Sequence, residues 1–330
     1  MNNTVFSAVQ PSGVPTIGNY VGAIKNWVKL QDEYDCIYSI ADLHTLTVKQ
    51  VPAELRARTL ELAALYIACG IDPEKCILFA QSHVHEHAEL TWILNTITSV
   101  GEMQRMTQFK DKSLKHAENV NMGLMDYPVL MASDILLYNT QYVPVGADQK
   151  QHLEIARDLA MRFNSRYSDT FVVPEPLIAK MGAKIMSLQD PTAKMSKSDV
   201  NANGFISMND APEEIVKKFK RAVTDSETCV RYDEENKPGV SNLMTIYSLF
   251  TGKDIAAIEA EFDGKGYGDF KLAVGEAVAE GVRPIQAKKE DLLKNKDYLA
   301  SVLKAGAEKA SYIAFKTLRK VYKKVGLLQL

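Results

Sequence analysis

The sequence predicts an α/β protein with a doubly wound, parallel-sheet (Rossmann-like) domain at residues 1–200 and a smaller all-helical domain at residues 201–330. Two observations predict this division. Short β-rich runs alternate with helical patterns in the first part, as in proteins built from β-α-β units. After Ala211-Pro212 the sequence reads as helix with short breaks. Residues 180–204, rich in Gly, Ser, Lys and Asp, predict a mobile loop between the two parts.

The elements of the first part follow one by one from the pattern of apolar residues. Short β-rich runs bounded by turn residues predict strands, and apolar residues at three- and four-residue spacing predict helices. The predicted strands are Thr4–Val9, Cys36–Ala41, Cys76–Gln81 and Gln141–Val145, and the predicted helices are Ile17–Gln31, Pro52–Cys69, Tyr127–Tyr138 and one that opens at Gly146. Because parallel sheets bind ligands at the carboxyl ends of their strands, we expect functional residues in the turns that follow them.

The composition is that of an ordinary globular protein, with 46% hydrophobic and 24% charged residues among 330. No apolar run approaches the roughly 18 residues of a membrane span, and the amino terminus lacks the basic start and apolar stretch of a secretory signal. We therefore expect a cytoplasmic enzyme without a membrane partner. The four cysteines form no close Cys-x-x-Cys pair, which predicts small hydrophobic side chains rather than disulfides or a zinc site.

Positive charge is concentrated at the carboxyl end of the chain. The net charge is only −2, but residues 301–330 carry seven Lys and Arg residues against the single acid Glu308. A basic terminal helix can face the phosphates of a nucleic acid, because lysines displace condensed counterions. Charge alone fits a solvated helix face at least as well.

The turn after the first predicted strand carries a first segment of interest, Gln10-Pro11-Ser12-Gly13-Val14-Pro15-Thr16-Ile17-Gly18-Asn19. A helix N-terminus presents unpaired N–H groups and a positive dipole end, and both suit phosphate. Gly18 has no Cβ, so a flat base can approach the backbone, and Thr16 and Asn19 can donate to phosphate oxygens. An ordinary turn with a helix cap is the alternative. The segment lacks the Gly-x-Gly-x-x-Gly fingerprint, which disfavours a nicotinamide oxidoreductase.

A second segment, Lys194-Met195-Ser196-Lys197-Ser198, places two lysines in the predicted loop. Two ammonium groups there can close over a polyphosphate. If they counter the negative charge that develops on a leaving pyrophosphate, these ammonium groups would raise the rate of an adenylyl transfer. A solvated surface loop is the alternative for any two lysines.

These two segments resemble the signatures of a known family. The pentapeptide at 194–198 is identical to the second signature of class I aminoacyl-tRNA synthetases, and Thr16-Ile17-Gly18-Asn19 resembles the first signature as the tryptophanyl-tRNA synthetases carry it. The resemblance to bacterial members of this family extends in order over nearly the whole chain. Its further segments are Ala41–His44, Arg105–Ser113, Tyr127–Tyr138, Gly146–His152, Ala222–Ser226 and Lys237–Leu243.

The resemblance implies a ligase that attaches L-tryptophan to tRNA(Trp) through a tryptophanyl adenylate, with ATP and Mg²⁺, in a homodimer whose helical domain reads the anticodon. Implied catalytic residues are Lys194, Lys197, Lys112, Thr16 and Asn19. Implied ATP contacts are Gln10, Pro11, Ser12, Gly18, Asn19, Gly146, Ala147, Asp148, Ile185, Lys194, Met195, Ser196, Lys197 and Ser198. For tryptophan, Asp134 is implied to accept the indole N–H, with Phe6, Met131, Ile135, Val143 and Val145 around the ring and Tyr127, Gln149 and His44 near the α-ammonium group.

The spacing around Asp134 bears on this pocket independently of the resemblance. Tyr127, Met131 and Asp134 fall on roughly one helix face at three- and four-residue spacing. A carboxylate on an apolar face needs a partner, and indole offers one N–H donor and no acceptor. Such a site can reject phenylalanine without editing. Spacing alone leaves open a local cap or ion pair for Asp134, with Met131 as plain core.

The segment His83-Val84-His85-Glu86-His87 offers three imidazoles at two-residue spacing. In an extended strand they would share one face. No cysteine or second cluster completes a tetrahedral zinc set, so we expect no resident metal and interpret the segment as a loop that leads into a helix from Ala88.

Besides the nicotinamide oxidoreductase, two other functions are alternatives to the ligase that the resemblance implies. A tyrosyl-tRNA synthetase would share the fold and the chemistry, but a phenol both donates and accepts, so a single acid among apolar residues suits indole better. A non-catalytic tRNA-binding paralogue is disfavoured because both signature segments are intact.

Overall fold

The structure is a computed structural model that describes residues 3–106, 109, 120–145, 150–177 and 184–329, and of residues 150–152 only the backbone. In chain order its elements are β1 (Thr4–Val9), α1 (Ile17–Asn19), the π-helical turn η1 (Tyr20–Ile24), α2 (Lys25–Leu30), β2 (Asp35–Ile40), α3 (Asp42–Thr45), α4 (Pro52–Ala68), β3 (Ile77–Ala80), the 3₁₀ turn η2 (Gln81–His83), α5 (Glu86–Asn95), α6 (Val100–Arg105), α8 (Met122–Leu136), β4 (Tyr142–Pro144), α9 (Lys150–Arg166), β5 (Glu175–Leu177), the 3₁₀ turn η5 (Ala202–Gly204), α10 (Pro212–Lys220), α11 (Pro238–Thr251), α12 (Ile255–Glu261), α13 (Tyr267–Lys294) and α14 (Lys296–Val325).

The five strands form one sheet in the order β3-β2-β1-β4-β5, and every neighbouring pair is parallel. The chain builds outward from β1 to β3 and then returns to the other side of β1 with β4. The winding therefore changes direction between β1 and β4, and sheets of this class bind ligands at the carboxyl ends of strands that flank such a point. The predicted doubly wound parallel sheet is confirmed.

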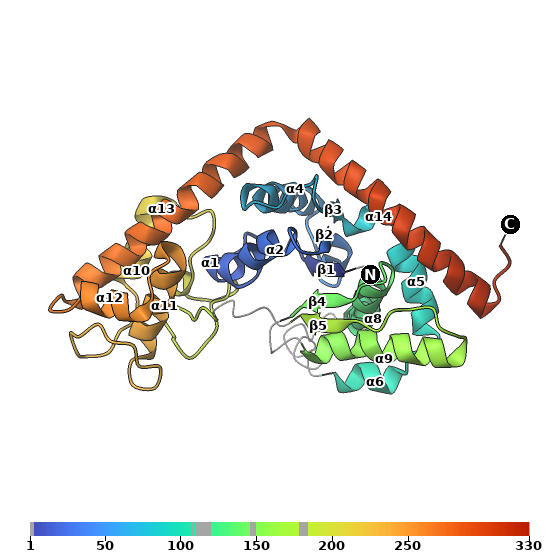
Figure 1. Cartoon of the computed structure of the whole chain (residues 1–330), viewed down its shortest axis with the longest axis horizontal. Helices are drawn as coiled ribbons and strands as arrows, with labels where there is room; N and C mark the ends of the chain where they lie inside the picture. The colour runs from blue at the N-terminus through green and yellow to red at the C-terminus, as the bar shows by residue number, and fades with distance from the viewer. Residues whose placement is uncertain (1–2, 107–108, 110–119, 146–149, 178–183, 330) are drawn as a thin grey trace.

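Two hydrophobic clusters cover the two faces of the sheet. Successive residues of a strand point to opposite faces, so Val5 and Leu78 belong to one cluster while Phe6 and Phe79 belong to the other. The first cluster includes residues of α2 and α4, and the second includes residues of α5, α8 and α9. Figure 1 shows the corresponding helices on either side of the sheet.

Helices α13 and α14, 28 and 30 residues long, form the two arms of an arch over the molecule (Figure 1). The second arm, α14, returns to the edge strand β3. A Cβ on Gly306 would overlap the carbonyl oxygen of Leu78, so only glycine permits this approach. Ser311 Oγ donates to Glu86 Oε1 at 2.7 Å and extends the contact to α5.

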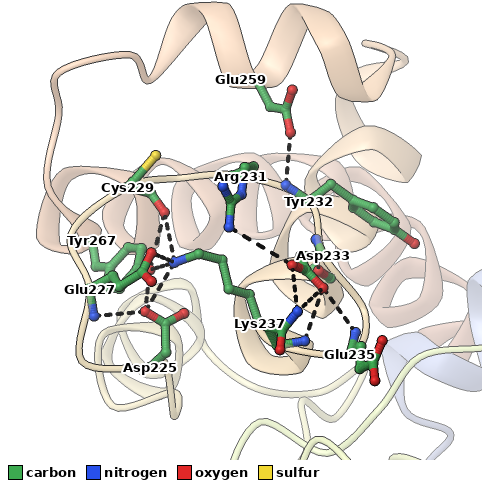
Figure 2. Close-up of polar contacts among 12 residues, drawn as sticks. Asp225, Glu227, Cys229, Arg231, Tyr232, Asp233, Glu235, Lys237, Glu259 and Tyr267 are labelled. Atoms are coloured by element: carbon green, nitrogen blue, oxygen red, sulfur yellow. Dashed lines mark hydrogen bonds and ion pairs between the residues drawn. The ribbon is translucent and has the colours of Figure 1, made fainter.

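An ion-pair cluster ties the segment before α11 to α13 (Figure 2). Lys237 is 2% exposed, and its Nζ lies 3.2 Å from Asp225 Oδ1 and 2.6 Å from Glu227 Oε2. The same ammonium donates to Tyr267 Oη at 2.9 Å. Desolvation would lower the pKa of Lys237, but hydrogen bonds to Glu227, Tyr267 and Asp225 outweigh it and raise that pKa.

The structure departs from the predicted elements in several places. Strand β5 was not predicted because Pro176 disrupts its pattern, and an edge position is where a sheet tolerates proline. Helix α8 begins at Met122, with Asn121 as its cap, and α5 begins at Glu86. All four cysteines are free, but Cys229 is exposed and so is not the buried hydrophobe expected. Among the described residues, no helix is long and apolar enough to cross a membrane.

Candidate active site

The turn between β1 and α1 is closed by Thr16 and Asn19. Thr16 Oγ1 accepts from the backbone N–H of Asn19 at 3.3 Å, and Asn19 Oδ1 accepts from the N–H and the hydroxyl of Thr16 at 2.9 and 3.1 Å. Thr16 is 1% exposed. The structure gives Thr16 a helix-capping role, in which its hydroxyl donates to Asn19, and its phosphate contact stays a prediction.

The second signature segment packs directly on this turn. The N–H of Met195 donates to the carbonyl of Ile185 at 3.0 Å, which folds the segment back on residues 185–187. A Cβ on Gly18 would lie 3.5 Å from Ile185 Cβ and 3.7 Å from Met195 Cβ. Ile185, Met195 and Gly18, all expected to contact ATP, are thus brought together.

Lys197 links the two signature segments. Its Nζ donates to Ser12 Oγ at 2.8 Å and approaches the carbonyl oxygen of Gly13 at 3.4 Å. The side chain keeps exposed surface, yet desolvation of its ammonium and the nearby charge of Arg58 lower the pKa of Lys197. Both of these hydrogen-bond partners are uncharged, so neither neutralises the ammonium group. Lys197 is therefore available to bind an anion.

A cavity of about 310 Å³ lies where these segments meet at the carboxyl end of β1, a volume typical of small-molecule sites. It is lined by Val9, Pro15, Asn19, Ala23, Ile24, Lys194, Met195, Ser196 and Lys197. Ser196 and Ser198, both exposed, share a hydrogen bond of 2.8 Å. Gln10, Pro11 and Ser12 follow β1 directly.

Asp134 lies in α8, 2% exposed, on the side of the sheet opposite α4. Its Oδ1 accepts from Gln81 Nε2 at 2.7 Å and lies 2.6 Å from His87 Nδ1, and its Oδ2 lies 2.8 Å from His44 Nε2. Burial alone would raise the pKa of Asp134, but the attraction of His87 and hydrogen bonds from His44 and His87 lower it to about 2. The carboxylate is therefore an anion at neutral pH.

The apolar residues expected around the indole ring belong to the hydrophobic cluster to which α8 contributes. Phe6, Ile135 and Val143 are buried in one cluster, and Met131 and Val145 pack against it partly buried. The rings of His44 and Tyr127 meet edge to face with centroids 6.3 Å apart. The structure thus brings together the residues expected around the indole ring and two of the three expected near the ammonium group. Lys112, Gly146, Ala147, Asp148 and Gln149 lie outside the described residues.

Comparison with known proteins places the chain in a family. Residues 1–282 match the family described as tRNA synthetases class I (W and Y). The chain belongs to this family. It is similar to a protein of Clostridium tetani named tryptophan–tRNA ligase, with 58% identity over 325 residues that cover 98% of this chain and 96% of the relative.

Solved structures of this family share the architecture. The tryptophanyl-tRNA synthetase of Mycoplasma pneumoniae is 37% identical with a TM-score of 0.91, and the match covers 99% of each chain. That of Campylobacter jejuni, complexed with ADP and tryptophan, is 36% identical with a TM-score of 0.85 and is covered over its whole length, against 98% of this chain. The protein is therefore a class I aminoacyl-tRNA synthetase, a ligase.

Three buried polar residues of this synthetase were missed by sequence reasoning: Gln81, His87 and Tyr138. His87 belongs to the three-histidine segment considered for zinc, but η2 and α5 leave His83 and His85 exposed and turn His87 inward. Among the described residues, no group of three or more His, Cys, Asp or Glu side chains could hold a metal ion. The sequence offered one signal for His87, because this histidine comes directly before the helix predicted from Ala88. That the helix packs against α8, which carries Asp134, is seen only in the structure.

Proposed function

We propose that this synthetase attaches L-tryptophan to tRNA(Trp) through a tryptophanyl adenylate. The observation that carries the proposal is the buried, anionic Asp134 among apolar side chains, because a carboxylate is the natural partner of the single indole N–H. The C. jejuni neighbour that binds ADP and tryptophan and the relatives named tryptophan–tRNA ligase support it.

The chemistry proceeds in two steps. The tryptophan carboxylate attacks the α-phosphorus of ATP in line and pyrophosphate leaves, with Lys194 and Lys197 countering its charge. Mg²⁺ arrives with ATP, held mainly by its phosphate oxygens. A terminal ribose hydroxyl of the tRNA then attacks the acyl carbon, and AMP leaves. Positioning of the reactants and electrostatic stabilisation of the leaving group account for the rate enhancement, without a covalent enzyme intermediate.

ATP is proposed to bind in the cavity between the two signature segments. Lys194, Met195, Ser196 and Lys197 line it from the second segment, and residues 194–198 are proposed to cover the phosphates. Gln10, Ser12 and Gly18 of the first segment keep the ATP contacts that the resemblance implies. Asn19 lines the same cavity, which supports its phosphate contact. Gly146, Ala147, Asp148 and Lys112 on the ATP side, and Gln149 on the tryptophan side, keep the roles that the resemblance implies.

The tRNA is proposed to bind mainly to the helical domain, residues 201–330, which reads the anticodon. The outer face of α14 supports a polyanionic partner. Lys316 Nζ lies 3.9 Å from the ring centroid of Tyr312, and the guanidinium of Arg319 lies 5.7 Å from that of Phe315. The two rings are 64% and 51% exposed, and interleaved cations and aromatic rings are typical of nucleic-acid surfaces.

A homodimer is proposed as the working assembly in the cytoplasm. Large apolar side chains stand exposed on neighbouring helices of the sheet domain: Trp92 of α5 by 73%, Val100 of α6 by 58% and Met122 of α8 by 71%. Contacts link α5 and α6 to α8. Exposed apolar groups on adjacent elements are typical of subunit interfaces.

Amino-acid-dependent exchange of labelled pyrophosphate into ATP, measured with each standard amino acid in turn, tests the function. We expect exchange with tryptophan alone. Exchange with tyrosine instead would identify the enzyme as a tyrosyl-tRNA synthetase. Absence of exchange with every amino acid would favour a non-catalytic tRNA-binding protein.

A further inference from the structure

The two oxygens of the Asp134 carboxylate have unequal surroundings. Oδ1 has two partners, the amide of Gln81 at 2.7 Å and Nδ1 of His87 at 2.6 Å. Oδ2 has one partner among the described residues, Nε2 of His44 at 2.8 Å. A carboxylate oxygen accepts two hydrogen bonds readily. Oδ1 is therefore filled by protein donors, and Oδ2 keeps room for one more.

The donors on Oδ1 belong to a buried chain that begins at Tyr138. Tyr138 Oη lies 2.8 Å from His87 Nε2, on the far side of the imidazole from Asp134. Burial and the charges of Asp134 and Glu86 raise the pKa of Tyr138 well above its ordinary value, so the phenol keeps its proton. An ionised carboxylate can only accept, so the imidazole proton lies on Nδ1, where it faces Asp134, and Nε2 of a neutral imidazole accepts from the Tyr138 hydroxyl.

Packing fixes each member of this chain. His87 and Gln81 are 0% exposed and Tyr138 is 2% exposed. Ser133 and Thr91 both donate to the carbonyl of His87, at 2.8 and 2.7 Å, which holds the start of α5 against α8.

The same chain reaches the expected substrate pocket at both ends. The Tyr138 ring stacks on Phe6, one of the apolar walls, with centroids 5.6 Å apart. At the other end, Gln81 accepts from the backbone N–H of Leu43 at 3.2 Å, next to His44.

We propose that His87, assisted by Gln81 and Tyr138, is the positioning residue that holds Asp134 Oδ1 and thereby presents Oδ2 to the N–H group of the substrate ring. The inference rests on the proposed function. It adds a specificity determinant outside the pocket wall. The enzyme distinguishes a ring that carries an N–H group from one that lacks it, because the accepting carboxylate of Asp134 can neither rotate nor take up a proton. Three protein groups, those of Gln81, His87 and His44, and one substrate donor then satisfy a carboxylate that would otherwise be costly to bury.

The test compares tryptophan with its sulfur isostere, 3-(1-benzothiophen-3-yl)alanine, in which a sulfur atom replaces the ring N–H. Both are assayed by pyrophosphate exchange with the full-length enzyme. We expect the wild type to prefer tryptophan by ~10²-fold in kcat/KM, since a hydrogen bond to a buried charge contributes about this much. His87→Leu should lower kcat/KM for tryptophan by ~10- to 100-fold and change that for the isostere by less than ~3-fold.

Two further variants separate positioning from a merely structural role. His87→Asn can place an amide N–H where Nδ1 donates, and it should restore most of the preference. Tyr138→Phe lets the imidazole proton move to Nε2 and should remove part of the preference. His83→Leu, from the exposed side of the same three-histidine segment, is the matched control and should behave as wild type.

The outcomes are distinguishable. A wild type that prefers tryptophan, together with His87→Leu and Tyr138→Phe enzymes that keep the full preference, would overturn the inference and leave the function standing. Equal losses for both substrates in His87→Leu and His87→Asn would mean that His87 only stabilises the fold. A wild type that does not exchange with tryptophan would refute the function itself. If His87→Leu does not fold, Tyr138→Phe and Gln81→Met carry the same comparison.

Discussion

Asp134 illustrates at the residue scale how neighbours decide the state of a buried acid. An isolated carboxylate in an apolar site would take up a proton, but His87 and His44 lower the pKa of Asp134 to about 2. The anion therefore persists over the whole physiological range. A single side chain thus combines the burial that excludes water with the charge that attracts an N–H donor.

Replacing this carboxylate should affect one substrate and spare the other. We expect Asp134→Ala to lower kcat/KM for tryptophan by ~10²-fold or more, because the indole N–H loses its acceptor. The KM for ATP should stay within ~3-fold of wild type. Pyrophosphate exchange measures both values. Asp126→Ala removes a carboxylate of the same helix that bonds to Asn95, and it serves as control. Equal losses for both substrates would contradict the assignment of Asp134.

The cysteines show the opposite effect of burial. Burial raises the pKa of Cys69 and of Cys76 to about 12, and it also raises the pKa of Cys36. The thiolate is the reactive form, so a raised pKa leaves little of it at pH 8. Cys229 is exposed.

Alkylation should therefore be selective. With iodoacetamide at pH 8, we expect Cys229 to react at least ~10²-fold faster than the other three cysteines, because it is exposed, whereas burial limits access to the other three and raises their pKa. Raising the pH should speed labelling of the buried thiols. Peptide mass spectrometry gives the site-specific rates, and the chain unfolded in guanidinium should label evenly. Even labelling of the folded protein would contradict the raised pKa values.

At the element scale, the contact of α14 with β3 depends on a missing side chain. Gly306 brings the helix backbone onto the Leu78 carbonyl, whereas Gly268, near the start of α13, has open space where a Cβ would be. The two glycines therefore offer a matched pair.

We expect Gly306→Ala to lower the free energy of unfolding by about 2 kcal/mol, since the added methyl must push α14 from the sheet edge. Gly268→Ala should leave it unchanged or raise it by up to about 1 kcal/mol, because alanine favours helix. Denaturant titration measures both. A Gly306→Ala protein as stable as wild type would mean that α14 moves freely relative to β3.

The outer face of α14 makes a separate prediction. Replacing both Lys316 and Arg319 by alanine should raise the KM for tRNA by ~10-fold and flatten its salt dependence, because phosphate contacts are lost. Tryptophan-dependent pyrophosphate exchange, which needs no tRNA, should stay unchanged. Lys294→Ala, which removes an exposed lysine paired with Asp291, is the control. Unchanged aminoacylation kinetics in the double variant would place the tRNA elsewhere.

For the whole molecule, the exposed apolar side chains of Trp92, Val100 and Met122 lie on α5, α6 and α8, which are helices of the sheet domain (Figure 1). We expect the wild type to sediment as a dimer at micromolar concentration. Trp92→Glu should shift it toward monomer, because a charge cannot be buried unpaired in an interface. Leu328→Glu, at an apolar side chain 86% exposed near the carboxyl end, should not. A monomeric wild type would refute the dimer.

The sheet and both signature segments could be predicted because each is recognised from a short run of consecutive residues. Strand and helix periodicity is written in consecutive residues, which is why β1, β2 and α4 were predicted within a residue or two of their observed bounds. Strand β5 escaped because a three-residue edge strand with a central proline has no such pattern. The family resemblance, rather than spacing, put Asp134 in the substrate pocket.

What the sequence by itself determined is therefore the fold class, the two segments that meet at the end of β1, and the family. Only the tertiary structure decided that Thr16 caps a helix, that Lys197 reaches Ser12, and that Gln81, His87 and Tyr138 converge on Asp134. The physical reason is separation along the chain. Gln81 and His87 lie 53 and 47 residues from Asp134, and no periodicity encodes which distant donor will satisfy a buried charge.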